Sequence, residues 1–568
     1  MKKAINLPKL QSTYGIAASN KMPGGISLWI NRDNIPWEID QWVQETQHEQ
    51  YNNLCELPVT YIPQLLYKSE SYDIEVNIPD TKKTEIQPTV PSTIKTKLFD
   101  HQLTGFTYAV NNSSFILGDD LGLGKTIQTI TYAAWLKEQG LVDHCLVICC
   151  TGTLKFNWLE EVSKHSTLSA RILAQRTTRR GNIVIGSVKD RIEELKNPIE
   201  EFFVITNKET LRDKQIQNLI KKGPNKFDMV VLDEIHKANN PTSKQGKAIL
   251  DLFTGYKYVV PISGTISPHR PENCFVPLTL IKQEHCTWTN FKKFYTIQDG
   301  MYNAVTGYKN LEILREQLNS CMLRRKKEKV LPSLPPKIWK EEFLELDTSQ
   351  EALYEEVLSG VRENIKNDIN LSVVNIAAQM TRLRQVTGCP HILTDAHVTN
   401  VKMDRMEELV EEIVYSGHKC VIASKWTNVT DEVLKRLHRW GTVEITGKIS
   451  DIQRQTNKEK FQNDDTVKVC VGTHDAMGVG ITLTAADYII FMDDPWSKAD
   501  KTQVEDRLHR IGTKNNVTII TLICKNTIDE FIHELVYKKG LLLDFLNGDI
   551  TTADYKQSMQ QLLTMVLG

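Results

Sequence analysis

The chain has 568 residues, of which 40% are hydrophobic and 24% are charged, and its formal net charge at pH 7 is −1. This length corresponds to about three or four domain-sized units, so the chain is long enough to bury a sizeable core. The near-zero charge excludes an overall positive field that would attract a polyanion, although a local basic stripe is enough to bind nucleic acid.

No apolar segment is long enough to span a membrane, and the N-terminus lacks the apolar core of a signal peptide. We therefore expect no membrane partner. The 11 cysteines are scattered and form no paired Cys-x-x-Cys ligand sets, so we also expect no structural zinc. Cysteines inside apolar runs are typical of free thiols in a reducing compartment, and we expect a cytoplasmic protein.

Residues 1–95 are predicted to form a small N-terminal accessory module that ends in a polar linker rich in threonine and proline. The segment has enough aromatic residues to fold, because chains that stay disordered are poor in them. Its sequence points to no activity. It could instead supply a binding site for a protein partner.

Residues 96–275 alternate short β-branched apolar runs with helical patterns. Such alternation predicts an α/β lobe with a mostly parallel sheet that is covered by helices on both faces. The predicted strands are Phe115–Leu117, Leu146–Cys150, Phe203–Thr206, Met229–Asp233 and Tyr258–Ser263.

The run Asp119–Thr126 joins the first of these strands to an amphipathic helix and contains Gly122, Gly124, Lys125 and Thr126. Glycines at a strand-to-helix turn let backbone N–H groups surround a phosphate, and the helix N-terminus adds positive potential. The lysine can then reach the β- and γ-phosphates, and the threonine hydroxyl can bind Mg²⁺. A Gly-rich turn that merely caps a helix is the alternative, and downstream residues must decide between the two.

An acidic pair, Asp233 and Glu234, follows the strand Met229–Leu232. Open α/β sheets bind ligands at the carboxyl ends of their strands, which is where this pair falls. Asp233 can hold the Mg²⁺ hydration shell, and Glu234 can orient and deprotonate an attacking water. The pair could instead be favourable early acids of a helix, but Lys125 and Thr126 in the same lobe make that reading improbable.

Residues 276–400 are predicted to be a helical insertion and crossover. Its charged run Met322–Val330 precedes the proline-rich run Leu331–Lys337, whose prolines end the helix and stiffen the chain. A charged run is usually a solvated helix face. Because this one lies at a domain junction, we expect it to contact phosphates or nucleotide.

Residues 401–540 repeat the α/β alternation and predict a second lobe, followed by a helical tail at 541–568. The predicted strands are Cys420–Ala423, Val443–Ile445, Val467–Val471, Tyr488–Phe491 and Val517–Ile523. The fold class is therefore α/β, with two tandem lobes built on parallel sheets.

Near the end of the second lobe, Arg507 and Arg510 are three residues apart and project from one helix face. Two guanidinium groups aimed across a cleft between the lobes can stabilise charge on the γ-phosphate in the transition state. In isolation the segment would be read as an exposed basic helix. Its combination with the phosphate loop and the acidic pair specifies one reaction, the hydrolysis of a nucleoside triphosphate.

The order of these motifs and the residues in them resemble those of the Swi/Snf-type ATPases of helicase superfamily 2, in a compact bacterial or viral form. The resemblance extends from about residue 96 to 540. The resemblance implies two RecA-like P-loop lobes with ATP and Mg²⁺ between them. It also explains Asp119, since the family has an Asp where the general P-loop pattern has its first Gly. One departure is Asp120, where the family usually has Glu.

The resemblance further implies residue roles. Gln102 falls in the adenine-reading segment, and Gly480 in a motif that links DNA contact to ATP. Residues matching nucleic-acid motifs are Lys155, Asn157, Trp158, Thr206, Lys425, Thr473 and Trp496. Those matching the motif that couples hydrolysis to nucleic-acid grip are Ser263, Gly264 and Thr265.

The predicted activity is that of a DNA-dependent ATPase that translocates on double-stranded or branched DNA through sequence-independent phosphate contacts. One alternative is a helicase that separates DNA or RNA strands. A second is a nucleotide-switched protein that acts on RNA polymerase or another DNA-bound complex. A scaffold that has lost hydrolysis is disfavoured by the intact Lys125, Asp233, Glu234, Arg507 and Arg510.

Overall fold

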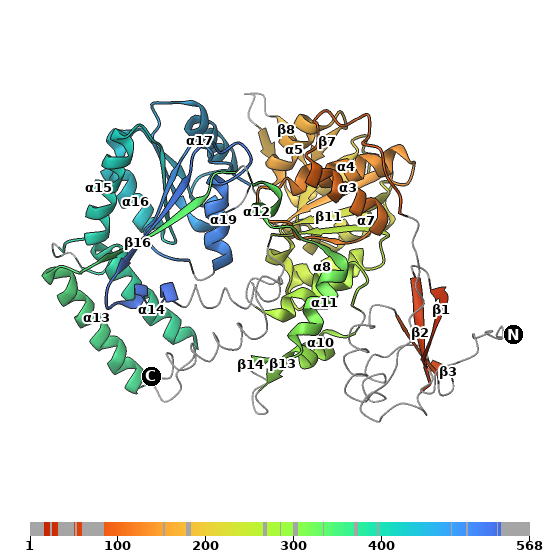
Figure 1. Cartoon of the computed structure of the whole chain (residues 1–568), viewed down its shortest axis with the longest axis horizontal. Helices are drawn as coiled ribbons and strands as arrows, with labels where there is room; N and C mark the ends of the chain where they lie inside the picture. The colour runs from red at the N-terminus through yellow and green to blue at the C-terminus, as the bar shows by residue number, and fades with distance from the viewer. Residues whose placement is uncertain are drawn as a thin grey trace.

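The computed structural model shows two α/β lobes side by side, with a small sheet from the N-terminal part of the chain beside the first lobe (Figure 1). The predicted fold class is confirmed. The residues that the structure describes are 16–22, 25–31, 50–51, 54–58, 85–150, 154–177, 183–264, 270–284, 286–298, 305–332, 334–367, 373–394, 396, 398–478, 480–495, 498–530 and 532–534.

The first lobe is built on a seven-stranded sheet in the order β15-β5-β12-β11-β6-β10-β7, and every neighbouring pair is parallel. Five of its strands are those that the sequence predicts. The strands are β5 (Ile116–Leu117), β6 (His144–Cys149), β7 (Ala170–Ile172), β10 (Phe203–Asn207), β11 (Phe227–Asp233), β12 (Tyr258–Ile262) and β15 (Met322–Leu323).

Helices cover both faces of this sheet. Successive strand residues point to opposite sides, so a strand that is apolar throughout gives the sheet two apolar faces to bury. Leu146 and Ile148 of β6 belong to one apolar core, and Val147 and Cys149 to the other. The helices are α3 (Asp100–Asn112), α4 (Lys125–Glu138), α5 (Leu154–His165), α6 (Val188–Leu195), α7 (Lys214–Lys222) and α8 (Lys244–Phe253), with short helices η3 (Lys208–Arg212) and η4 (Ile235–Ala238) and the hairpin β8 (Gln175–Thr177) and β9 (Ile183–Ile185).

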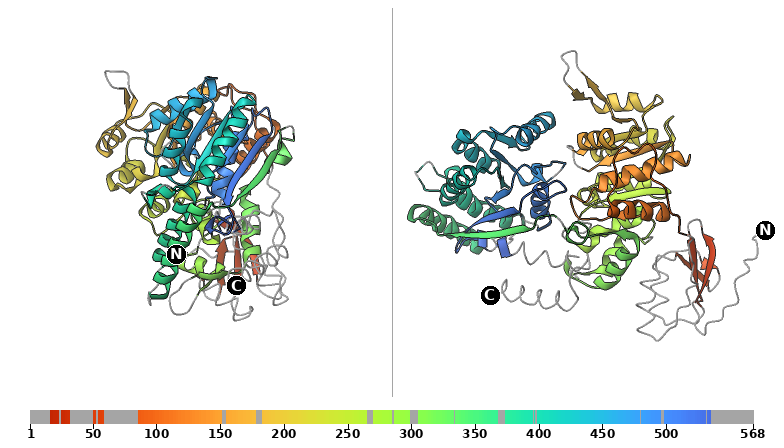
Figure 2. Two further views of the ribbon diagram at one scale, coloured as in Figure 1. Left: turned by 90° about the vertical axis from the view of Figure 1, so that its left-hand side faces the viewer. Right: turned by 45° about the horizontal axis from the view of Figure 1, so that its top comes forward.

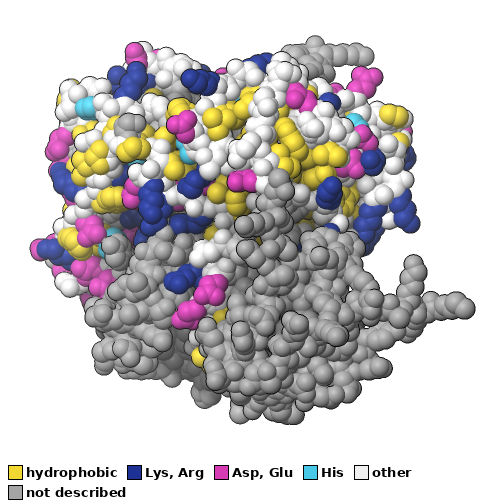
Figure 3. All heavy atoms as spheres, turned by 45° about the vertical axis from the view of Figure 1, so that its right-hand side comes forward, with side chains coloured by type: hydrophobic (Ala, Val, Ile, Leu, Met, Phe, Trp, Pro, Cys, Tyr) yellow, Lys and Arg dark blue, Asp and Glu magenta, His cyan; other side chains and the backbone are white. Residues whose placement is uncertain are grey.

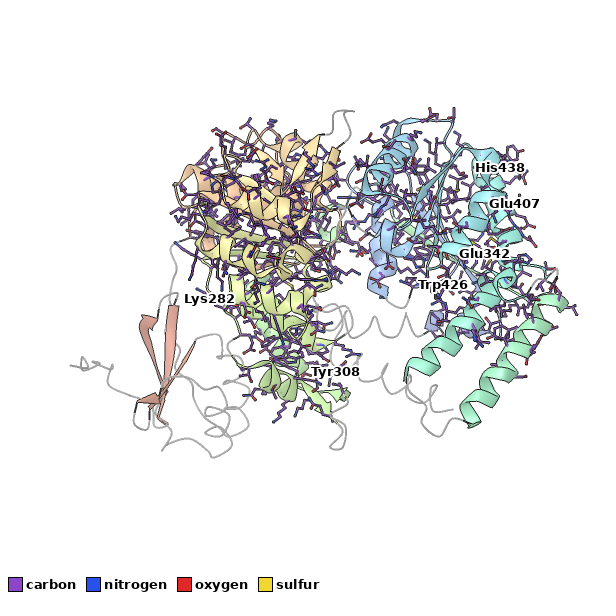
Figure 4. The ribbon with its side chains drawn as sticks, turned by 180° about the vertical axis from the view of Figure 1, so that it is seen from behind. Lys282, Tyr308, Glu342, Glu407, Trp426 and His438 are labelled. Atoms are coloured by element: carbon purple, nitrogen blue, oxygen red, sulfur yellow. The ribbon has the colours of Figure 1, made fainter. Side chains whose placement is uncertain are left out.

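A largely helical stretch extends the first lobe at one end. Figure 4 shows Tyr308 of its hairpin at the far end of this extension. The elements are η5 (Pro271–Cys274), α9 (Phe275–Leu280), α10 (Trp288–Tyr295), β13 (Thr296–Gln298), β14 (Val305–Tyr308), α11 (Leu311–Cys321) and α12 (Lys327–Val330).

The second lobe has a six-stranded parallel sheet in the order β16-β21-β20-β17-β19-β18. Its strands are β16 (Lys337–Leu344), β17 (Cys420–Ser424), β18 (Thr442–Ile445), β19 (Val469–Thr473), β20 (Tyr488–Phe491) and β21 (Val517–Cys524). Its helices are α13 (Thr348–Asn367), α14 (Val373–Gly388), η6 (Pro390–Ile392), α15 (Val401–Tyr415), α16 (Thr427–Arg436), η7 (His438–Trp440), α17 (Asp451–Asn463), α18 (His474–Met477) and α19 (Lys498–Leu508).

Three strands of the two large sheets are absent from the sequence-based expectation: β7, β15 and β16. The first two have only three and two residues, which is too short for a periodic signal. β16 directly follows the prolines of the crossover, and it pairs with β21 over its whole length. The crossover therefore donates one strand to each sheet, β15 to the first lobe and β16 to the second.

Part of the N-terminal segment forms a four-stranded antiparallel sheet in the order β1-β2-β4-β3. Its strands are β1 (Ile16–Met22), β2 (Gly25–Asn31), β3 (Gln50–Tyr51) and β4 (Leu54–Pro58). Figure 2 shows this sheet on the side of the first lobe away from the second. The role of residues 1–95 stays a prediction, and the predicted tail at 541–568 lies outside the described residues.

The surface carries both signs of charge. On the face shown in Figure 3, lysine and arginine side chains alternate with aspartate and glutamate side chains, in keeping with the net charge of −1. Within the described parts of the chain, no helix has the length and apolarity that crossing a membrane requires. Ten cysteines have side chains that the structure describes; nine of them are buried, and Cys286 is partly exposed.

Candidate active site between the two lobes

The phosphate loop joins β5 to α4 at the carboxyl edge of the first sheet. Gly122 and Gly124 have φ angles of +86° and +75°, in the left-handed region that favours glycine. Gly124 is the N-cap of α4, and a Cβ atom there would collide with the amide of Gln102. The loop conformation therefore requires glycine at both positions.

Lys125, the first residue of α4, points back into this loop. Its Nζ donates hydrogen bonds to the backbone oxygens of Asp119 (2.7 Å) and Asp120 (3.2 Å). Burial lowers the pKa of Lys125, and the carboxylates of Glu234 and Asp119 oppose that shift. Thr126 follows in the first turn of the same helix and is partly buried.

Gln102 lies against the phosphate loop. Its Nε2 donates to the backbone oxygen of Leu123 (3.4 Å), and its Oε1 accepts the N–H of Phe99 (3.1 Å) at the start of α3. The side chain is buried. This places the predicted adenine-reading residue next to the loop, where its amide also caps a helix.

Asp119 is predicted to bind the nucleotide. Its carboxylate is fully buried and pairs with Arg325, whose Nε lies 3.0 Å from Oδ1, and with Gln128, whose Nε2 lies 3.1 Å from Oδ2. A carboxylate held in this way is compensated by a guanidinium. Asp119 therefore anchors the loop, and a role in binding the nucleotide stays a prediction.

The acidic pair lies at the end of β11, as predicted. Glu234 has a φ angle of +55°, which is uncommon for a residue with a side chain and typical of functional sites. Burial and the neighbouring Glu234 raise the pKa of Asp233 to about 7, while Trp158 and Lys125 lower it. The site thus holds two close carboxylates and one lysine, an excess of negative charge.

Glu234 is held from both lobes. Gln503 of α19 donates from Nε2 to Glu234 Oε1 over 3.2 Å, and His236 Nδ1 lies 3.2 Å from Glu234 Oε2. The same His236 nitrogen lies 2.8 Å from Ser263 Oγ. Burial lowers the pKa of His236 to about 4, so the ring is neutral at pH 7.

His236 therefore links the acidic pair to Ser263, which the sequence placed in the coupling motif. Gly264 lies beside the loop as well, because a Cβ atom there would be 3.1 Å from Leu121 and 3.6 Å from Lys125 Nζ. Thr265 lies outside the described residues.

Arg507 and Arg510 lie at the end of α19 and face the first lobe. Arg507 donates to the backbone oxygen of Gly478, and Arg510 Nη1 donates to Thr482 Oγ1 (2.9 Å). Burial and the neighbouring Arg510 lower the pKa of Arg507 to about 10, while Glu234 opposes the shift. A Cβ atom on Gly122 would lie 3.3 Å from Arg510 Cγ, so Arg510 packs against the phosphate loop.

Other contacts hold the two lobes together around this site. Lys237 lies 3.5 Å from Asp500, and Lys458 lies 3.4 Å from Glu160. A Cβ atom on Gly480 would lie 3.4 Å from Leu154 of α5, which brings the second-lobe glycine against the first lobe. In Figure 1, α12 and α19 lie at the boundary between the lobes.

Two of the residues predicted to bind nucleic acid are buried and bound to other side chains. Trp158 is 0% exposed, and its Nε1 donates to Asp233 Oδ2 over 2.8 Å. Thr206 is also buried and donates to Thr210 (3.0 Å). Both side chains thus contact their own lobe, Trp158 at Asp233 and Thr206 at Thr210, and their role in binding nucleic acid stays a prediction.

The other members of that set are near the carboxyl edges of the sheets. Lys155 and Thr473 are buried and Asn157 is partly buried, whereas Lys425 pairs with Asp475 over 2.7 Å. Trp496 lies outside the described residues. A role of these residues in binding nucleic acid stays a prediction.

Four functional candidates escaped the sequence reasoning: His236, Gln503, Arg325 and Lys327. His236 and Gln503 stand inside motifs that the sequence does single out, two residues after Glu234 and four before Arg507. Arg325 and Lys327 belong to the charged crossover run. No local signal could show that their partners are acids of the two lobes.

Comparison with known proteins adds the family. The model of the SNF2-related domain matches residues 36–392, and that of the helicase conserved C-terminal domain matches residues 402–512. The mouse protein "DNA annealing helicase and endonuclease ZRANB3" is 26% identical over 471 residues, which cover 81% of this chain and 42% of the mouse protein. An "Uncharacterized ATP-dependent helicase" of Mycoplasma pneumoniae is 27% identical over 438 residues, which cover 76% of this chain and 40% of that protein.

Among solved structures, the chain is similar to the "Sulfolobus solfataricus SWI2/SNF2 ATPase core in complex with dsDNA", with 25% identity and a TM-score of 0.36. The match covers 83% of this chain and 99% of that one. The chain spans 42% and 40% of the length of the two curated relatives named above.

Proposed function

The chain belongs to the SNF2-related family of helicase-like ATPases, and from this premise we propose that it hydrolyses ATP to translocate on double-stranded DNA. Such movement would remodel DNA structures or displace bound proteins. The observation that carries the proposal is the split site. The first lobe supplies Lys125 and the acidic pair, and the second supplies Gln503, Arg507 and Arg510.

The residues at the end of β11 fit Mg²⁺. Asp233 and Glu234 are buried together, and burial and the neighbouring Glu234 raise the pKa of Asp233 to about 7, so a bound cation would stabilise the ionised pair. Mg²⁺ prefers oxygen ligands and is usually held by one or two protein groups together with substrate phosphates. Asp233 and the Thr126 hydroxyl would hold it, and the bound ion would neutralise charge on the β- and γ-phosphates.

The remaining chemistry comes from the side chains. Lys125 would exchange the backbone oxygens of its own loop for phosphate oxygens. Glu234, held by Gln503 from the second lobe, would orient the attacking water and accept its proton at a carboxylate oxygen. Arg507 and Arg510 would stabilise the charge that develops on the transferred phosphate, a contribution of about 10³–10⁵ in rate in characterised nucleotide hydrolases.

Double-stranded or branched DNA is the proposed partner because the mouse relative is named a DNA annealing helicase. Lys155, Asn157, Lys425 and Thr473 would contact phosphates from the two lobes. Opening and closing of the cleft would let each lobe grip the backbone in turn. Such contacts are independent of sequence and weaken with added salt.

The test is a set of ATPase rates with no nucleic acid, single-stranded DNA, duplex DNA, forked DNA and RNA. The proposal requires the highest rates with duplex or forked DNA. Lys125→Ala and Glu234→Gln should abolish the stimulation, and Lys329→Met, on an exposed lysine of the same lobe, is the control. Equal rates with all five samples would refute the proposal.

Triplex displacement and strand separation distinguish movement from unwinding. A translocase displaces the third strand of a triplex without opening the duplex. Strand separation at the same rate as triplex displacement would instead favour the helicase alternative.

A further inference from the structure

The crossover segment, residues 322–337, carries positive charge that the sequence suggested would meet phosphates or nucleotide. In the structure its charged side chains meet carboxylates of both lobes instead. Arg325 binds Asp119 in the first lobe, and Lys327 and Lys337 bind Asp506 in the second. Figure 1 shows the segment running between the lobes, with α12 near α19.

At its first-lobe end, the crossover segment runs alongside the phosphate loop. β15 pairs with β5, and the backbone bonds continue beyond the strands, from Gly118 N to Leu323 O (2.8 Å) and from Asp120 N to Arg325 O (3.1 Å). Arg325 then binds the Asp119 carboxylate, and its Nη2 also donates to Gln128 Oε1 (2.7 Å). Backbone and side chain together bind the crossover to the loop.

The next step is the short helix α12. The Asp120 carboxylate accepts the backbone N–H of Lys327, with 2.9 Å between Oδ2 and N. Arg324 lies 3.7 Å from the same side chain. Both acids that open the phosphate loop, Asp119 and Asp120, therefore hold the crossover.

At its second-lobe end, Lys327 binds the residues that directly precede the two arginines. Its Nζ donates to Asp506 Oδ1 (2.8 Å) and to the backbone oxygen of His509 (2.7 Å). Asp506 precedes Arg507, and His509 precedes Arg510. A shift of the Lys327 head group would move both arginines.

Lys337 completes this junction. Its Nζ lies 2.8 Å from Asp506 Oδ1 and 2.9 Å from Glu505 Oε2. Burial alone would raise the pKa of Asp506, but Lys337 and Lys327 outweigh it and lower the pKa to about 2. The carboxylate therefore stays charged at neutral pH, and buried charge-assisted bonds of this kind are strong and directional.

The loop end of this chain of contacts is where the nucleotide would act. Lys125 Nζ binds the backbone oxygens of Asp119 and Asp120, the same two residues whose carboxylates hold Arg325 and the start of α12. To bind phosphate, Lys125 must give up these oxygens. That exchange changes the hydrogen bonding of the two residues whose side chains hold the crossover.

We propose that the crossover segment couples the phosphate loop to the arginine pair, with Arg325 and Lys327 as positioning residues that set Arg507 and Arg510 for hydrolysis. The order of contacts runs from Lys125 to Asp119 and Asp120, then to the crossover, and then to Asp506 and His509. This inference rests on the ATPase activity of the proposed function.

The first test is Lys327→Met, which keeps the length of the side chain and removes its charge. Binding of a fluorescent ATP analogue, which depends on the first lobe, should stay within about threefold of wild type. The kcat at saturating ATP and DNA should fall at least about tenfold, because both arginines lose their support. Lys329→Met, on an exposed lysine of the same helix, is the matched control and should match wild type.

A second readout reports closure of the lobes directly. Glu160 of α5 and Gln455 of α17 touch across the lobes, with 3.4 Å between Oε2 and Nε2. Cysteines at these two positions can be joined by a short bismaleimide in a background with Cys55→Ser and Cys286→Ser, since the other nine native cysteines are buried. A non-hydrolysable ATP analogue should speed cross-linking in the wild-type background, and Lys327→Met should remove most of that acceleration.

The double variant Lys327→Met with Asp506→Asn tests the pair itself. Because the two changes share one interaction, the combined loss of kcat should be smaller than the product of the losses in the two single variants, although Asp506→Asn also weakens the contact with Lys337. If Lys327→Met does not fold, the nearly isosteric single variant Asp506→Asn replaces it. This change removes the carboxylate that Lys327 binds and leaves the phosphate loop unaltered, so the same split between kcat and nucleotide binding is expected.

Wild-type kcat and wild-type cross-linking in the folded variant would overturn the inference, as would equal losses of kcat and of nucleotide affinity. Failure of the proposed function looks different. In that case the wild-type ATPase would not respond to DNA, whereas nucleotide-dependent cross-linking and its loss in Lys327→Met would persist.

Discussion

Replacing Trp158 with phenylalanine removes one hydrogen-bond donor from the acidic pair and keeps most of a fully buried ring. A hydrogen bond to a charged group contributes about 1.5–3 kcal/mol. If the indole holds Asp233 in the orientation that hydrolysis requires, that free energy is added to the activation barrier. Because each 1.4 kcal/mol corresponds to a factor of ten, kcat should fall about 10- to 150-fold.

The pH dependence of stability separates this role from simple packing. The pKa of Asp233 is about 7 in the folded protein, above the usual range, so folded-state stability falls as the pH rises toward 7. The Trp158 donor lowers this pKa, and its loss raises it further. In metal-free protein, the Tm difference between Trp158→Phe and wild type should therefore be larger at about pH 8.5 than at about pH 5.

Trp440→Phe is the matched control, because the buried indole nitrogen of Trp440 has no hydrogen-bond acceptor. This variant should keep wild-type kcat, and its Tm difference should not depend on pH. The assays are DNA-stimulated ATP hydrolysis at saturating ATP and thermal unfolding at the two pH values. A folded Trp158→Phe protein with kcat within twofold of wild type would refute the reasoning.

Three further substitutions probe other parts of the structure. Gly124→Ala should lower the affinity for ATP analogues at least about tenfold, because its φ is +75° and the new methyl group meets the Gln102 amide. Gly140→Ala is the control: this glycine also has a positive φ but lies in open space, so the affinity should not change. Arg510→Ala should lower kcat by about 10³ or more while analogue binding changes little, and equal losses of both would argue against a transition-state role. His533 binds Asp494 and lies 3.1 Å from Glu341, contacts that raise its pKa. His533→Ala should therefore cost roughly 1.5–3 kcal/mol in unfolding measured at about pH 6, and less as the pH rises through the folded pKa; an equal loss at about pH 9 would contradict this.

The two lobes and their strands could be read from the sequence because the signals are local. Runs such as those of β6, β11 and β17 are apolar without alternation, which is typical of strands buried on both faces. The phosphate loop was equally readable, since its glycines must adopt positive φ angles between a strand and a helix. The short strands β7 and β15 escaped because two or three residues carry no period.

The burial of Trp158 and its contact with Asp233 could not be predicted from the sequence. A motif records that a residue type is required, but not which neighbour requires it. Trp158 stands in a motif associated with DNA, and the fold buries its ring and gives its N–H to Asp233. Burial of that kind depends on how α5 packs against the sheet, which α5 alone does not encode.

By itself, the sequence determined the fold class, the phosphate loop, the acidic pair and the arginine pair, because each depends on residues adjacent in the chain. Only the tertiary structure decided how these parts are joined. Asp119 and Arg325 are 206 positions apart, and Lys327 and Asp506 are 179 apart. Contacts over such separations depend on the register of two sheets and on how the two lobes close on each other. The amino-acid pattern around any one of these residues specifies neither the register nor the closure.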